Sequence, residues 1–290
     1  MELSRSARLP RYERRGNLGH VLYLQHPGVT APFYASSMSE FTQPALSPSL
    51  NAVLRCPRRF HLEKLRRART LAPFASSALG QEVHRRIAQS LREGAPADEG
   101  ALTPPRRVLL QAGETLDSLI WRAQCALTLY NVKCRAWLQA HPVKAVEHYC
   151  RQPYQSGAEQ VTVSGIFDLI LASDEGDVLV DWKTGGADRS ETQLKFYLVL
   201  RFLETGQPPR RAEAISLSTG RSLTVPWTPD LPLWFGEMVA SMMRWLEACR
   251  EDTPEAGGHC RYCPYAYGCE HSEAPGRTLS DTFTGEVFRA

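Results

Sequence analysis

The chain of 290 residues carries 34 Lys and Arg against 31 Asp and Glu, and 43% of its residues are hydrophobic and 22% charged. This balance is typical of a globular protein and excludes a disordered, collagen-like or small disulfide-scaffold chain. No run of about 18 apolar residues occurs and the N-terminus lacks the apolar stretch of a secretory signal, so no membrane contact is expected. We expect an intracellular, cytoplasmic protein with reduced thiols, built as one large domain or two small ones.

Positive charge is concentrated near the N-terminus. Residues 1–72 hold 12 Lys and Arg against 4 Asp and Glu, so the remainder is net negative. An arginine-rich segment suits contact with phosphate, although a solvated arginine-rich surface explains the same composition. We expect an extension over residues 1–45, with a short strand near His20–Leu24 and no assigned chemistry, a main domain over 46–272 and a tail over 273–290.

Helical patterns dominate the first half of the chain. The stretch Ser47–Leu65 predicts a capped helix that breaks near Cys56–Pro57, because proline disfavours helix in the residue before it. Ser77–Leu91 carries apolar residues at helical spacing, and a Gly/Pro-rich linker follows at 93–105. One long amphipathic helix is expected over Val108–Ala140.

The second half of the chain has the sequence pattern of a β-sheet with helical crossovers. Apolar, β-branched segments predict strands over Val143–Tyr149, Gln160–Leu171, Val178–Trp182, Ala212–Leu217 and Ser222–Val225. Helices are expected over Glu191–Glu204 and Leu233–Cys249. The sum is an α/β or α+β domain: a mixed central sheet flanked by helices, with helical material inserted before the sheet.

Two aspartates and a lysine stand on adjacent predicted strands. Asp181 and Lys183 share a strand face, while Trp182 points to the opposite side. A turn at 174–177 makes a hairpin that brings Asp168 alongside Asp181. Facing carboxylates are costly without a cation, and hard oxygen ligands favour Mg²⁺ or Mn²⁺. The spacing therefore predicts a divalent metal site with Lys183 facing whatever the metal binds.

This combination suits metal-assisted hydrolysis of a phosphodiester. A metal polarises the phosphate and lowers the pKa of water, and a lysine orients that water or stabilises developing charge. The tripeptide D-x-K is a weak pattern by itself, and it gains weight from its place one hairpin after another aspartate. The alternative is a surface ion pair at a strand end.

Three further side chains converge on these strands. The imidazole of His84, in the helical segment ALGQEVHRRI, can complete a metal shell with Asp168, Asp181 and the backbone carbonyl of Trp182. Glu147 is more simply a surface acid of an edge strand than a ligand of a second metal. Gln193 and Tyr197 stand four residues apart on one helix face, so both can reach toward the strand ends.

Three cysteines cluster near the C-terminus, in HCRYCPYAYGCE. Three thiolates so placed suit a metal site, which would need a fourth ligand. Cys56 offers one upstream, in a comparable Cys-Pro context. Such coordination is compatible with zinc or with an iron-sulfur cluster, and His259 and His271 keep a Cys/His zinc site open. We interpret the four remaining cysteines as packing residues.

In order along the chain, G-x-x-x-H, G-x-F-D, D-W-K-T-G and Q-x-x-x-Y resemble the RecB-type branch of the PD-(D/E)XK nuclease superfamily, over about residues 47–271. The resemblance implies an αβββαβ core of the restriction-endonuclease-like kind. It implies that His84, Asp168 and Asp181 are metal ligands, that Lys183 is the catalytic lysine, and that Gln193 and Tyr197 line the DNA site.

The cysteine pattern is similar to the iron-sulfur members of this branch, which include AddB-type subunits and CRISPR-associated exonucleases. That similarity implies a [4Fe-4S] cluster that staples the two ends of the domain together, held by Cys56, Cys260, Cys263 and Cys269. Structural zinc is the alternative.

The sequence and the resemblance together predict a metal-dependent DNA nuclease, an exonuclease on single-stranded DNA or DNA ends in repair or recombination. No G-x-x-x-x-G-K-[ST] motor motif occurs, so a helicase partner is expected if the enzyme does not work alone. Alternatives are a CRISPR adaptation nuclease that trims DNA before integration, a non-catalytic DNA-binding subunit of a helicase-nuclease complex, and a zinc-stapled hydrolase. Phosphate contacts are expected from Arg55, Arg58, Arg59, Arg66 and Arg67.

Overall fold

The computed structural model describes residues 44–68, 70, 72–273, 278–281 and 287–289. Its contacts divide the chain into two units, Met1–Thr42 and Gln43–Ala290, and the described residues all belong to the second. The strand expected within the first unit lies outside the described residues. Among the described helices, none combines the length and apolar character needed to cross a membrane.

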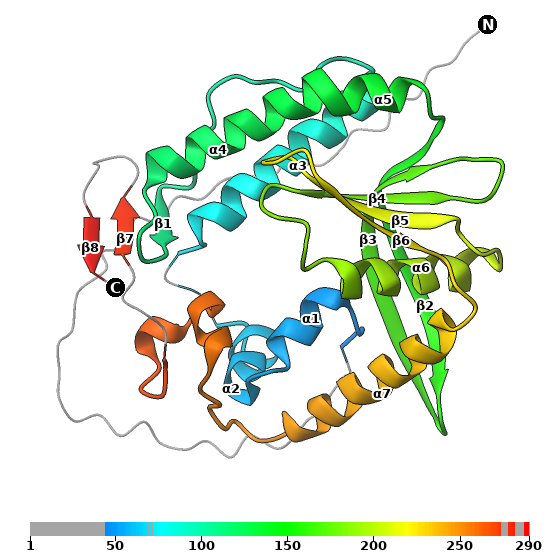
Figure 1. The fold of residues 1–290 in the computed structure, drawn as a ribbon. Coiled ribbons are helices and arrows are strands. Elements are labelled where there is room, and N and C mark those ends of the chain that lie inside the picture. The colour runs from blue at the N-terminus through cyan, green and yellow to red at the C-terminus, as the bar shows by residue number, and fades with distance from the viewer. Residues whose placement is uncertain (1–43, 69, 71, 274–277, 282–286, 290) are drawn as a thin grey trace, which may run out of the picture. The chain divides into compact units, whose positions relative to one another are not determined.

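A five-stranded mixed sheet forms the centre of the second unit, in the order β2-β3-β4-β5-β6 (Figure 1). Its strands are β2 (Val143–Ser156), β3 (Glu159–Leu171), β4 (Val178–Lys183), β5 (Arg211–Ser216) and β6 (Ser222–Pro226). β4 and β5 are parallel and the other pairs antiparallel. A parallel pair needs a crossover, and α6 (Glu191–Thr205) provides it.

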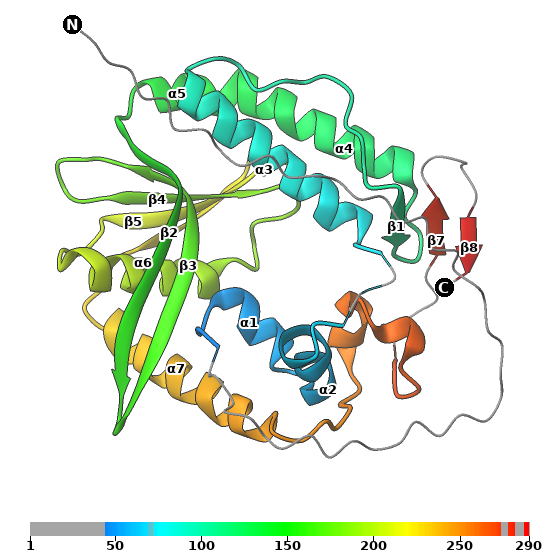
Figure 2. The same ribbon diagram turned by 180° about the vertical axis from the view of Figure 1, so that it is seen from behind.

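Helices cover both faces of this sheet (Figures 1 and 2). α6, α7 (Leu231–Ala248) and the short α1 (Pro48–Val53) share a core on one face, and α3 (Ala75–Glu93) and α4 (Leu116–Leu129) share a core on the other. β4 shows the expected alternation, since its residues 178, 180 and 182 pack on the α3–α4 side and residue 179 on the α6 side. The order α3-β2-β3-β4-α6-β5 is the expected αβββαβ core, which confirms the fold class.

The predicted break near Cys56–Pro57 is present. Ser47 caps α1 by accepting a hydrogen bond from the Leu50 amide, and α2 (Pro57–Phe60) follows, continued by a π-helical turn, η1, over His61–Leu65. Cys56 has φ −141° and ψ 111°, the extended conformation that a following proline imposes. This sharp turn places the cysteine at the start of α2.

The prediction of one helix over Val108–Ala140 is wrong. Arg107–Leu110 forms strand β1, a turn with Gly113 at φ 82° follows, and α4 begins after the capping residue Thr115. After α4 come a π-helical turn, η2 (Tyr130–Cys134), and α5 (Arg135–Gln139). β1 is a strand because it pairs with β7 (Thr278–Asp281), which pairs in turn with β8 (Val287–Arg289). No pattern within a short stretch of sequence predicts that β1 pairs with a strand so distant along the chain.

Candidate metal centre and active site

Two glycines let the helices approach the sheet closely. A Cβ on Gly80 of α3 would lie 3.1 Å from Thr184 Oγ1, just beyond β4, so α3 comes near the end of that strand. One turn later along α3, His84 reaches the sheet. A Cβ on Gly165 of β3 would lie 2.9 Å from Tyr197 Cε1, so α6 also packs tightly there. Close packing of a helix on the sheet therefore explains the glycine of the G-x-x-x-H motif, Gly80, and that of the G-x-F-D motif, Gly165.

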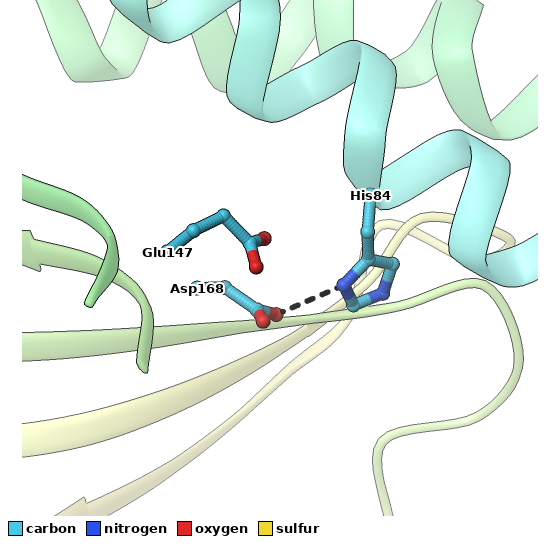
Figure 3. A group of neighbouring side chains, drawn as sticks. All are labelled: His84, Glu147 and Asp168. Atoms are coloured by element: carbon cyan, nitrogen blue, oxygen red, sulfur yellow. Dashed lines mark ion pairs between the residues drawn. The ribbon is translucent and has the colours of Figure 1, made fainter. Parts of the chain in front are cut away.

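Asp168 of β3 is the hub of the site. Its side chain is buried, and its Oδ2 accepts a 2.8 Å hydrogen bond from the Trp182 amide. The same oxygen lies 3.3 Å from Nδ1 of His84, the ion pair drawn in Figure 3. The two strands and α3 thus meet at one carboxylate. The Trp182 group that contacts Asp168 is the amide, and the expected ligation by its carbonyl stays a prediction.

Glu147 of β2 joins this group, which the sequence interpretation of it as a surface acid did not anticipate. Ligand atoms of His84, Glu147 and Asp168 all lie within 4.8 Å of one another. Figure 3 shows the Glu147 carboxylate turned toward the other two side chains. Glu147 has a left-handed φ of 52°, uncommon for a residue other than glycine. Its place on the strand next to Asp168 was the only available signal in the sequence.

A second set of contacts begins at Asp181 and ends on α6. The Lys183 Nζ lies 2.6 Å from Asp181 Oδ2 and donates a 2.8 Å hydrogen bond to Gln193 Oε1. The Gln193 amide nitrogen donates to Asp181 Oδ1 at 3.1 Å and to the Tyr197 hydroxyl at 2.9 Å. All four side chains are those predicted from the two motifs. Together with His84 and Asp168 we call them the polar row.

Charge in the polar row is poorly compensated. Burial, and after it the facing Asp168 carboxylate, raises the pKa of Asp181 to about 6 despite the neighbouring Lys183. Burial and Asp168 also raise the pKa of Glu147. Burial alone would lower the pKa of His84, but its hydrogen bond to Asp168 and the nearby carboxylate charges raise it. The site therefore attracts positive charge.

The residues fit a divalent cation. Asp181 Oδ2 is buried and contacts the Lys183 ammonium at 2.6 Å, while the nearby carboxylates of Glu147 and Asp168 share only one imidazole, that of His84. Carboxylate oxygens with one imidazole suit Mg²⁺ or Mn²⁺. His84, Glu147 and Asp168 would hold the ion, with Asp181 beside them.

A groove of about 780 Å³ opens on one side of the polar row. Gln193 and Tyr197 line it where it meets the row. We call it the arginine groove, and its characteristic lining residues are Arg55, Arg59, Arg189, Tyr149, Ile166 and Tyr262. The two tyrosines and the isoleucine are exposed although they are large and apolar. Neither Arg55 nor Arg189 pairs with a carboxylate among the described residues.

The five arginines predicted to contact phosphate lie in three different surroundings. Arg55 and Arg59 line the groove. Arg58 and Arg66 instead pair with Asp252, at 3.3 and 2.6 Å. Arg67 is exposed and has a left-handed φ of 45°, and it does not line the groove. Arg189 lines the groove and was missed, because its loop carries no basic cluster.

A second cavity, of about 620 Å³, lies against α3. We call it the His84 hollow, and its polar lining residues include Ser76, Ser77, His84, Arg85, Arg92 and Glu147. It shares no lining residue with the arginine groove. We call His84, Glu147 and Asp168 the metal-donor group, and it borders the hollow because His84 and Glu147 line that cavity. Lys183 is next to the arginine groove, because its partner Gln193 lines the groove.

The four predicted cluster cysteines lie on two segments that hydrogen bonds join. Cys56 immediately precedes α2. Cys260 lies within the short turn η3 (Gly258–Tyr262), Cys263 follows that turn, and Cys269 follows the turn η4 (Ala266–Gly268). The Arg58 amide donates to the Thr253 carbonyl and the Tyr265 hydroxyl donates to the Ala68 carbonyl, both at 3.1 Å. Cys260 and Cys263 are buried, and Cys56 and Cys269 half-buried. Figure 2 shows α2 beside this C-terminal segment.

Comparison with known proteins defines the class. The model of the PD-(D/E)XK nuclease superfamily matches residues 45–270, and the chain belongs to this superfamily. No curated protein matches the chain.

Two solved structures resemble the fold. SSO0001 is 14% identical, with a TM-score of 0.34, over 77% of this chain and 96% of its own. A protein from Eubacterium rectale named as a candidate exonuclease is 12% identical, with a TM-score of 0.45, over 75% and 83%.

Proposed function

We propose that this nuclease is a metal-dependent DNA exonuclease that acts on single strands. The observation that carries the proposal is the polar row, in which a lysine and a buried aspartate stand beside a cation-binding group. Superfamily membership supports phosphodiester hydrolysis as the reaction class. In that reaction water adds across one P–O bond, so one fragment leaves with a terminal phosphate and the other with a hydroxyl.

The chain's own residues have separable roles in this reaction. A bound Mg²⁺ or Mn²⁺ would polarise the phosphate and lower the pKa of water. Gln193 holds the Lys183 ammonium on one side and the Tyr197 hydroxyl on the other, so it fixes the direction in which the lysine points. Lys183 then orients the attacking water or stabilises the charge that develops on phosphate.

The arginine groove supports a single-stranded substrate. Exposed aromatic rings such as Tyr149 and Tyr262 offer stacking surfaces that unpaired bases use. Arg55 and Arg189 lack carboxylate partners among the described residues and suit backbone phosphates. A duplex hides its base faces, which makes stacking of this kind specific to unpaired strands. Separation of a duplex would then come from a helicase partner.

The test is cleavage of end-labelled linear DNA and of circular single-stranded DNA in Mg²⁺, Mn²⁺ or EDTA. We expect metal-dependent cleavage of the linear strand, resistance of the circle, and a loss of at least about a hundredfold in Lys183→Ala. Lys195→Ala is the matched control, because Lys195 is on α6 but pairs with Glu191 at the surface. Binding without cleavage, equal in Lys183→Ala and the control, would refute a catalytic role and leave a DNA-binding subunit.

A [4Fe-4S] cluster on Cys56, Cys260, Cys263 and Cys269 is the second part of the proposal. The donor chemistry fits, since two thiols are buried and the two segments that carry the four are hydrogen-bonded together. Such a cluster would staple α2 to the segment that bears Tyr262, and both contribute walls to the arginine groove. Its role would be to hold the groove in shape, with zinc as the alternative occupant.

A further inference from the structure

The polar row separates two cavities of different chemistry. On the α6 side, the arginine groove has about 780 Å³ and aromatic walls. On the α3 side, the His84 hollow has about 620 Å³, within the rough range of 300–1,000 Å³ typical of small-ligand sites. A phosphodiester held at the metal-donor group would have one flanking fragment on each side.

The walls of the hollow suit a phosphate-bearing ligand. Arg92 lines it and forms no ion pair in the part of the chain that the structure describes, although its charge acts on Glu147 in the same cavity. Ser76 and Ser77, in the first turn of α3, line the opposite end of the same cavity, about 24 Å from Arg92 along the helix axis. Arg85 is less available, because Glu82 holds its guanidinium through two hydrogen bonds at 2.6 and 2.7 Å. Arg92 is therefore the principal cation available to a ligand.

We infer that the His84 hollow receives the fragment that each cleavage releases, a nucleotide or very short oligonucleotide with its terminal phosphate near Arg92. The inference rests on the proposed function and names a subsite of the same reaction. Arg92 lies eight residues after His84 on α3, about 12 Å along the helix axis, so a fragment whose phosphate binds Arg92 extends only one or two nucleotides past the metal-donor group. Product length is thus set by the distance from His84 to the Arg92 end of the cavity.

Direct binding tests this subsite without requiring catalysis. Isothermal titration of the full chain in Mg²⁺ uses thymidine 5′-monophosphate in one arm and thymidine 3′-monophosphate in the other. Binding of either supports the inference and shows which end carries the phosphate. We expect Arg92→Ala to weaken that binding about fivefold or more. Arg244→Ala, at an exposed position of α7, is the control. Equal binding in all variants, or binding of neither nucleotide, overturns the inference.

Product analysis gives the second readout. The wild type and Arg244→Ala should release the same short products from an end-labelled strand, and Arg92→Ala should shift the length distribution and resist inhibition by added nucleotide. Active enzyme whose products and inhibition are unchanged in Arg92→Ala refutes the subsite while the nuclease proposal stands. Nucleotide binding that depends on Arg92 in a protein that never cleaves would leave a nucleotide-binding site in the hollow, but would refute the nuclease proposal and, with it, the role of that site in receiving a product.

Discussion

Glu147 and Asp168 lie between the pairs Val146–Leu169 and His148–Phe167 of the β2–β3 ladder, at a position where the pairing is interrupted and Glu147 holds a left-handed backbone. That conformation costs on the order of 1–2 kcal/mol for a residue with a side chain. It also turns one carboxylate toward another, with His84 alongside. A cation bound between the carboxylates of Glu147 and Asp168 would explain both the backbone strain and the closeness of two like charges.

We predict that Glu147→Gln raises the Mn²⁺ concentration needed for half-maximal cleavage by about tenfold or more, because it removes one anionic ligand. Saturating metal should restore most of the activity, since Lys183 is untouched. A metal titration of cleavage rate measures both effects. Glu159→Gln is the control, at an exposed acid on the same hairpin. An unchanged metal requirement would show that Glu147 is not a ligand.

The arginine groove predicts a salt dependence of DNA binding. Arg55→Ala and Arg189→Ala should each lower the slope of log K against log salt by about 1, because each removes a phosphate contact. Arg66→Ala should leave the slope unchanged, since Arg66 pairs with Asp252 outside the groove. Fluorescence anisotropy of a labelled single strand at several salt concentrations checks this. Equal slopes for all three variants would contradict the assignment of the groove.

Gly165→Ala should be costly. The new methyl group would meet Tyr197 Cε1 at 2.9 Å and Leu200 Cδ2 at 3.0 Å, both in the packed core under α6. We expect a loss of about 1–3 kcal/mol in the free energy of unfolding, measured in urea, and lower activity as Tyr197 moves from Gln193. Gly185→Ala has nothing within 4 Å of the added carbon and should be neutral. Wild-type stability and activity in Gly165→Ala would mean that α6 adjusts freely.

A network on the other half of α6 predicts acid sensitivity. Burial would raise the pKa of Asp177, but hydrogen bonds from Lys144 and Arg201 hold it below its ordinary value. Burial would also raise the pKa of Glu204, but hydrogen bonds from His148 and Arg201 hold that pKa below its ordinary value. A lowered folded-state pKa gives stability that is present above the unfolded-state values near pH 4 and is lost as pH falls through the folded ones.

Arg201→Met should therefore lower the free energy of unfolding by about 3 kcal/mol at pH 7, because it leaves two carboxylates without their shared partner. At pH 3 the difference from wild type should shrink as the carboxylates take up protons. Urea unfolding at both pH values measures this. A difference that is equal at pH 7 and pH 3 would rule out the linkage.

The cluster proposal predicts colour and iron. Anaerobically purified wild type should be brown, and Cys56→Ser should lose visible absorption and bound iron together. Cys125→Ser, at a half-buried thiol of α4, should keep both. Loss of the cluster should also weaken single-strand binding, because α2 and the η3–η4 segment form walls of the groove. A colourless wild type with about one zinc per chain would establish the zinc alternative.

Patterns that act over a few residues were readable from the sequence. Alternation along β4 put Asp181 and Lys183 on one face and Trp182 on the other, and the hairpin brought Asp168 beside them. The break at Cys56 follows from a single proline. These features depend on backbone geometry between near neighbours, which any short stretch of sequence carries.

Features that depend on distant partners were not readable. β1 was predicted as helix because its partner β7 lies far along the chain. Glu147 had the pattern of a surface acid, and only the folded backbone, which is left-handed at this residue, turned its carboxylate toward Asp168. The basic cluster around α2 was divided by Asp252, which neutralises two of its arginines, while Arg189 joined the groove from a loop. Long-range packing determines which charged residues come into contact, and this cannot be predicted from composition.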